Sequence, residues 1–147
     1  MKISFDRPPL WDKIDAAFHV AGKPVIFAWG DTVFNPERVP MTKELHAHEE
    51  MHGERQFGYP CEALGWELAT ETWWQCYIDS PTFRLAEEIP AHQAEYRAYC
   101  KRHRGAGSQR ARLEMIATKL ASPLYGDGGL VSIVKAKELI LNHGIGE

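Results

Sequence analysis

The spacing of apolar positions divides the chain into several helices and one short hairpin. Apolar residues recur at helical spacing over 10–20, and Gly22-Lys23-Pro24 ends that pattern. Residues rich in β-branched and aromatic side chains follow on both sides of a Gly30-Asp31 turn signal, which predicts a β-hairpin over 25–34. Further helical patterns cover 43–57, 62–79, 85–104, 109–121 and 131–142. The pattern therefore predicts one α+β domain over 1–147 that is mostly helical.

Composition and charge narrow the classes of protein that this chain can represent. It has 147 residues, 44% of them hydrophobic and 25% charged, as in ordinary soluble domains. The net charge of -3 argues against nucleic acid as a partner. The longest apolar run, at 24–29, is much shorter than the roughly 20 residues of a membrane span, which argues against a membrane partner. Asp6, Arg7 and two prolines interrupt the segment where a signal peptide needs apolar residues, which predicts a mature cytoplasmic protein.

The predicted helix over 43–57 contains the sequence HEEMH, an H-E-x-x-H motif, at 48–52. Thr42 is a suitable N-cap for this helix, and Gly58 with Pro60 would end it. Four residues make little more than one helical turn, so His48 and His52 lie on one face. Their ring nitrogens can then bind one tetrahedral Zn²⁺ at roughly 2.0–2.1 Å. The motif therefore predicts that His48 and His52 are metal ligands and that Zn²⁺ is the cofactor.

Glu49 follows the first histidine and lies about 100° around the helix from it. Zinc lowers the pKa of a bound water toward about 7, and a nearby carboxylate can pass the proton of that water to a leaving amine. This arrangement predicts a hydrolase that cleaves peptide bonds, with Glu49 as the catalytic base. The alternative is a solvated polar helix, but a chain of this composition would contain the motif by chance only about 0.03 times.

A catalytic zinc site needs a third protein ligand. The segment over 83–99 offers Glu87, Glu88, His92 and Glu95, and His46 and His103 are also available. Arg55 stands where the longer three-histidine motif requires glycine, which favours a carboxylate as the third ligand. Residue types and spacing alone do not choose among these carboxylates.

The chain resembles the gluzincin branch of the zincin metallopeptidases, and most closely the small HExxH proteins of phages and their bacterial hosts. The resemblance lies in VIFAWGDTVFNP (25–36), HEEMH (48–52), FRLAEEIPAH (83–92) and ASPLYG (121–126). It implies a zincin-like fold in which the HExxH helix lies beside a small sheet. It also implies a peptide or protein substrate, a cytoplasmic location and, for a phage protein, the host cytoplasm.

The same resemblance implies that Glu88 is the third zinc ligand, because Glu88-Ile89-Pro90-Ala91 fits the E-x-x-A pattern of such helices. Glu87 is its close rival, and Glu95 comes third. Pro90 is unusual inside a helix and places the start of this helix near Glu88.

Peptide hydrolysis also requires a donor for the developing oxyanion. Tyr125, in a glycine-rich loop, is the candidate that we assign as catalytic, with Tyr96 and His143 as alternatives. In zincins an edge strand often binds substrate as an added strand, so the hairpin over 25–34 is either such an edge or a purely structural element.

Two other functions remain open at this point. The chain could be a non-catalytic phage or assembly protein that zinc stabilises, because a structural metal contributes folding energy. It could also be a protease that acts near DNA, since the stretch over 101–112 is rich in lysine and arginine. A domain of this size has little room for substrate selection, so we also expect a targeting partner protein.

Overall fold

The computed structural model describes residues 1–57, 65–126 and 128–142. Its small sheet consists of β1 (Lys2–Ser4), β2 (Phe27–Trp29) and β3 (Thr32–Phe34), in the order β1-β3-β2. β2 and β3 form the predicted antiparallel hairpin, and β1 pairs parallel to β3 along its other side. The sequence pattern did not predict β1, because three residues are too few to show a period. The chain is mostly helical with one small sheet, which confirms the α+β class.

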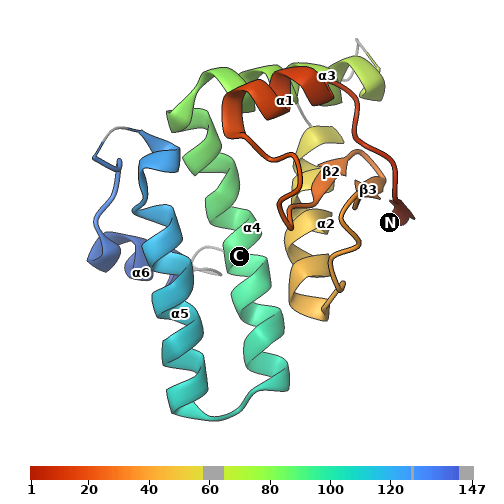
Figure 1. Cartoon of the computed structure of the whole chain (residues 1–147). Coiled ribbons are helices and arrows are strands. Elements are labelled where there is room, and N and C mark those ends of the chain that lie inside the picture. The colour runs from red at the N-terminus through yellow and green to blue at the C-terminus, as the bar shows by residue number, and fades with distance from the viewer. Residues whose placement is uncertain (58–64, 127, 143–147) are drawn as a thin grey trace.

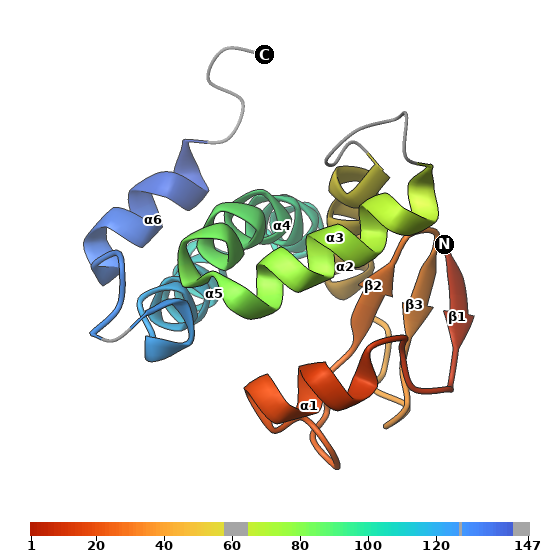
Figure 2. The ribbon, with the colours of Figure 1, turned by 90° about the horizontal axis from the view of Figure 1, so that it is seen from above.

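The helices account for most of the chain. They are α1 (Trp11–Phe18), α2 (Lys43–Phe57), α3 (Trp66–Asp79), α4 (Pro81–Arg102), α5 (Ala106–Leu120), the 3-10 turn η2 (Pro123–Tyr125) and α6 (Ile133–Leu141). Figure 1 shows α2, α4 and α5 side by side, with α4 in the middle and with α1 and α3 across one end. Figure 2 shows the sheet beside α2 and, on the opposite side of α4, the pair α5 and α6.

Two apolar clusters flank the middle of the molecule. On one side, α1, β2 and α3 contribute Ile14, Phe27, Trp73 and Trp74 to an aromatic cluster. On the other side, α4, α5, α6 and η2 contribute an aliphatic cluster that includes Ile116, Leu120, Tyr125 and Ile140. The interface between α2 and α4 lies between these two buried clusters. Polar side chains on that interface are therefore enclosed by apolar walls.

α4 differs from the prediction at its N-terminal end. The expectation that Pro90 marks the start of this helix is wrong, because α4 begins at Pro81 and continues through Pro90. Ser80 caps the helix by accepting a hydrogen bond from the Phe83 amide at 3.1 Å, and Pro81 occupies the first turn, where no amide donor is needed. Pro90 still removes one hydrogen bond from the interior of the helix, but α4 packs against α2, α3, α5 and α6, which hold it together.

Some predicted features differ or fall outside the described part of the chain. The helix predicted over 109–121 begins earlier in the structure, because α5 already starts at Ala106. Gly58, Pro60, the first residues of the helix predicted over 62–79, and His143 lie outside the described residues. Among the residues that are described, no helix is both long and apolar enough to cross a membrane.

Candidate metal centre

The helix α2 is fixed against the hairpin by residues that surround the HExxH motif. The Thr42 hydroxyl accepts a hydrogen bond from the Leu45 amide at 3.2 Å, which confirms Thr42 as the cap. Gly53 follows His52 directly, and a Cβ at this position would lie 2.4 Å from the Gly30 carbonyl oxygen. Gln56 then accepts from the Gly30 amide at 2.7 Å and donates to the Ala28 carbonyl at 2.9 Å. The side chain of Gln56 and the missing side chain of Gly53 thus set the close approach of α2 to β2.

Two ion pairs join α2 to α4 at opposite ends of their interface. Arg102 donates to Glu44 at 2.8 Å, and Arg55 donates to Glu87 at 2.5 Å. Both arginines are partly exposed, whereas both carboxylates are buried. The two pairs fix the register of α4 along α2.

This register brings His48 and His52 of α2 to Glu88 of α4. The two Nε2 atoms of the histidines lie 3.1 Å apart. The Glu88 carboxylate lies 3.2 Å from His48 Nε2 and 3.4 Å from His52 Nε2. All three side chains are buried. We call His48, His52 and Glu88 the cavity group, because all three line a cavity described below.

The separations within the cavity group match those of ligands around a small metal ion. Tetrahedral ligands about 2.0–2.1 Å from Zn²⁺ lie about 3.3–3.4 Å from one another. The three observed separations, 3.1, 3.2 and 3.4 Å, are close to this value. Two imidazoles and one carboxylate are also a donor set that occurs at catalytic zinc sites. The residues present therefore fit a metal ion, although geometry alone does not determine which metal.

A second group of donors lies next to the first and shares His48. The Glu95 carboxylate is 3.2 Å from His48 Nδ1 and 2.6 Å from His92 Nδ1. Arg112 approaches the other oxygen of Glu95 at 3.5 Å and lies over the ring of Tyr99. We call His48, His92 and Glu95 the inner group. These three residues also lie close enough together to hold a metal ion.

The hydrogen bonds of the inner group determine which histidine nitrogens are left for a cation. Nδ1 of His48 and Nδ1 of His92 both face the Glu95 carboxylate, so both donate a proton to it and leave Nε2 with a lone pair. His92 Nε2 lies 3.4 Å from Glu88 Oε2 and has no hydrogen-bond partner among the described residues, whereas Glu88 Oε2 also lies 3.2 Å from His48 Nε2. Two buried acceptors that face each other are costly unless a cation or a donor lies near them. This second observation also fits a metal ion at the cavity group.

The carboxylates around His48 strongly perturb its titration. Burial lowers the pKa of His48, but the hydrogen bonds that its ring donates to Glu88 and Glu95 outweigh burial and raise the pKa to about 10. Burial lowers the pKa of His92, which keeps that ring neutral. Although burial opposes it, the pKa of Glu88 lies well below its usual range because His52 and His48 surround it. In the absence of a metal, a proton on His48 thus takes the place of the cation between two carboxylates.

The structure separates the rival candidates for the third ligand. Glu88 belongs to the cavity group, whereas Glu87 pairs with Arg55, and Glu95 and His92 belong to the inner group. Neither His46 nor His103 belongs to a metal-competent group among the described residues. Of the two tyrosines considered as oxyanion donors, Tyr125 lines the cavity described below, whereas Tyr96 does not.

Two residues that hold the site were not expected from the sequence. Tyr77 of α3 donates from its hydroxyl to Glu88 Oε1 at 2.5 Å. Burial and the charge of Glu88 raise the pKa of Tyr77 well above its usual value, so the hydroxyl keeps its proton. Arg84 donates to the carbonyls of Tyr77 and Ile78 at the end of α3 and to that of Leu124 in η2. Arg84 therefore fixes the backbone that carries Tyr77 and Tyr125.

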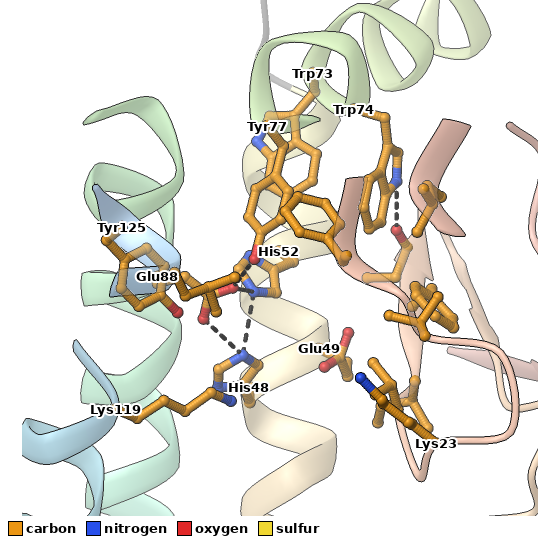
Figure 3. Close-up of a pocket in the computed structure, with 18 residues that line it drawn as sticks. Lys23, His48, Glu49, His52, Trp73, Trp74, Tyr77, Glu88, Lys119 and Tyr125 are labelled. Carbon is orange, nitrogen blue, oxygen red and sulfur yellow. Dashed lines mark hydrogen bonds and ion pairs between the residues drawn. The ribbon is translucent and has the colours of Figure 1, made fainter. Parts of the chain in front are cut away.

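A cavity of about 280 Å³ opens beside the cavity group. Its walls come from α1, the hairpin and α3 on one side and from α5 and η2 on the other (Figure 3). Glu49 lines this cavity, and burial raises the pKa of its carboxyl above the usual value. Tyr125 is fully buried beside Glu88, and its hydroxyl has no hydrogen-bond partner among the described residues. A carboxylate and a phenol thus border the same cavity as the three donor atoms.

The hairpin reaches this cavity through its first strand. β2 is an edge strand of the sheet, and Val25, Ile26, Phe27 and Ala28 line the cavity. The Ala28 carbonyl already accepts hydrogen bonds from Gln56 and from Trp74 Nε1, at 2.9 and 3.0 Å. The hairpin is therefore bound to α2 and α3 at Ala28, while the residues just before it border the cavity.

Comparisons of the chain with protein-family models, with curated proteins and with solved structures find no match. The resemblance to gluzincins therefore stays a prediction, and the site is interpreted from its own residues.

Proposed function

We propose that the chain is a zinc-dependent metallopeptidase with a zincin-like fold. The observation that carries this proposal is the cavity group. His48 and His52 come from one helix turn and Glu88 from a second helix, with donor separations of 3.1–3.4 Å and an adjoining cavity lined by Glu49. The same arrangement of a small sheet, an HExxH helix and a second glutamate helix supports the proposed likeness to zincins.

Each residue has a defined role in this proposal. His48, His52 and Glu88 hold the ion, with Tyr77 and Glu95 orienting Glu88 and His48. When bound, Zn²⁺ acts as a Lewis acid that lowers the pKa of water and polarises a carbonyl. Glu49 takes the proton of the attacking water and delivers it to the leaving nitrogen.

Tyr125 is the proposed donor to the developing oxyanion. Burial, followed by the charge of Glu88, raises the pKa of Tyr125 well above its usual value, so the phenol remains a donor at neutral pH. Its hydroxyl has no other partner among the described residues, which leaves its proton available for a substrate oxygen. Val25 and Ile26, the half-buried residues just before β2, are the proposed contacts for an extended peptide.

The substitution Glu49→Gln tests the proposal. It should leave the zinc content unchanged and lower the rate of peptide hydrolysis by about 10²–10⁴-fold, because a general base contributes about that factor. Glu50→Gln is the matched control, since Glu50 is exposed and lies on the other face of the helix turn. Full hydrolytic activity in zinc-loaded Glu49→Gln would contradict the proposed mechanism.

A structural metal site is the second candidate, and the position of His92 is what favours it. Its unpartnered Nε2 lies 3.4 Å from Glu88 Oε2, so His92 could close the coordination as a fourth ligand. Against a structural site, the ligand atoms of His92 do not form a metal-competent group with both His52 and Glu88. A structural site predicts that His92→Ala lowers both zinc content and melting temperature, whereas Glu49→Gln alters nothing.

The third possibility, action on DNA, receives less support. Two of the basic residues in 101–112 form ion pairs within the protein, Arg102 with Glu44 and Arg112 with Glu95. These pairs account for part of the basic stretch without nucleic acid.

A further inference from the structure

Two lysines border the cavity beside Glu49, one from each wall. Lys23 comes from the turn between α1 and β2, and Lys119 from the last turn of α5. In Figure 3 they approach from opposite sides of the view, with His48 and Glu49 between them. Both side chains are exposed, and neither forms an ion pair with a described residue. The cavity thus has two ammonium groups that its own carboxylates do not neutralise at contact distance.

The backbone under both lysines is fixed. The Lys23 amide donates to the Val20 carbonyl at 3.0 Å, and the Lys23 carbonyl accepts from the Val25 amide at 2.8 Å. Lys119 lies between the fully buried Ala117 and Leu120, which anchor the end of α5. The lysine side chains are flexible, but the backbone positions from which they extend, at the rim of the cavity, are fixed.

The remainder of the cavity is apolar. The half-buried side chains of Phe18, Val25 and Ile26 face it, and the aromatic cluster closes it behind them. A volume of about 280 Å³ is near the lower end of the range of ligand sites, about 300–1,000 Å³. The cavity therefore suits one or two residues of a peptide rather than a long folded segment.

Together these features define the chemistry of a ligand. We propose that the cavity binds the C-terminal end of a peptide, with a large apolar side chain among Phe18, Val25 and Ile26 and the free α-carboxylate between Lys23 and Lys119. The inference rests on the proposed peptidase function for the nature of the ligand, and it restricts that function to substrates with a free C-terminus. A neutral amide at this end would leave both ammonium groups without a counter-charge.

Binding of a short ligand tests this inference without any need for hydrolysis. The probes are N-acetyl-phenylalanine and its amide, titrated calorimetrically into the protein at the metal content found on purification. The parent should bind the acid at least about tenfold more tightly than the amide, because only the acid carries a negative charge for the two ammonium groups. N-acetyl-glycine should bind at least about tenfold more weakly than N-acetyl-phenylalanine, because it lacks the apolar side chain.

Variants assign the preference to the two lysines. In the double variant K23Q/K119Q the acid and the amide should bind within about threefold of each other. K13Q is the matched control, since Lys13 is exposed on α1 but does not line the cavity, and it should keep the full preference. Elemental analysis of all variants excludes a change in metal content as the cause.

Several results would overturn the inference. Three of them are equal binding of acid and amide, no binding of either, and an unchanged preference in K23Q/K119Q. The fourth is tighter binding of N-acetyl-glutamate α-amide than of N-acetyl-phenylalanine, which would show that the lysines bind acidic side chains. Peptide hydrolysis without this preference would refute the inference and leave the proposed function intact. The preference in a protein that hydrolyses no peptide would support the carboxylate site and refute the proposed function.

Discussion

The cavity group and the inner group contain the same kinds of side chain and share His48, yet they face different surroundings. His52 and Glu88 border the cavity together with Glu49, whereas His92 and Glu95 do not line it. Glu95 instead contacts two histidines and Arg112, all within the protein. The comparison shows that donor atoms at metal-binding distance do not by themselves define a reactive site. Access to a cavity and a nearby carboxylate distinguish the cavity group, which we propose is reactive, from the inner group.

The largest expected effect is the loss of metal in His52→Ala. Removing one of three protein ligands should reduce the zinc content from about one per chain to nearly none and lower the melting temperature, because zinc that binds only the folded state stabilises it. His46→Ala is the control, since His46 lies on the same helix outside both groups. Elemental analysis and thermal unfolding measure the two effects. Equal zinc content in both variants would remove the cavity group from consideration.

A smaller effect is expected from Glu95→Gln. The glutamine cannot accept protons from His48 and His92 as a carboxylate does, so zinc affinity should fall by about 10–100-fold without being abolished, as for other outer-shell partners. Competition with a fluorescent chelator measures the affinity. Complete loss of zinc, as in His52→Ala, would instead identify the inner group as the primary site.

Tyr77→Phe should have a still smaller effect. It removes one hydrogen bond to Glu88, and the zinc affinity should fall by about tenfold, the lower end of the range for outer-shell partners. Tyr99→Phe is the control, because the Tyr99 hydroxyl bonds to Ser108 at the surface, away from Glu88. An equal decrease in both variants would show that Tyr77 does not position the ligand.

The pH dependence of the metal-free protein provides a further test of the cavity group. The folded pKa of His48, about 10, lies above the unfolded value, so its contribution to stability is complete below about pH 6.5 and disappears as the pH rises toward 10. In EDTA, the free energy of unfolding should decrease over pH 7–10 by at most about 1.4 kcal/mol per pH unit. With saturating zinc, His48 is a deprotonated ligand and this decrease should vanish. Urea denaturation over this range measures both, and a metal-free protein whose stability rises with pH would contradict the assignment.

The sequence was informative where the chemistry lies within one helix. His48, Glu49 and His52 could be placed by helical geometry alone, and the Thr42 cap fixed where that helix begins. The prediction that Glu88 is the third ligand required the resemblance to gluzincins, because the distance from Glu88 to His48 depends on how α4 packs against α2. Its neighbour Glu87, one residue earlier, faces Arg55 instead. Only the register of the two helices decides between them.

The residues that the sequence did not reveal act through tertiary contacts. Tyr77 has the spacing of a core aromatic residue, and its bond to Glu88 becomes visible only once α3 crosses α2 and α4. Arg84 joins α3 to η2 across 40 residues of chain. The start of α4 that was predicted from Pro90 was wrong, because packing along the helix outweighs the local preference of proline. Local propensity could not predict these contacts, because none of them is local.

The most direct test of the central claim is the zinc content of the purified protein beside Glu88→Ala and Glu87→Ala. These two adjacent carboxylates differ in the structure only in what they face, the histidines for Glu88 and Arg55 for Glu87. The proposed site predicts about one zinc per chain in the parent and in Glu87→Ala, and nearly none in Glu88→Ala. No zinc in the parent after zinc is supplied, or equal zinc in both variants, would contradict a metal centre at His48, His52 and Glu88.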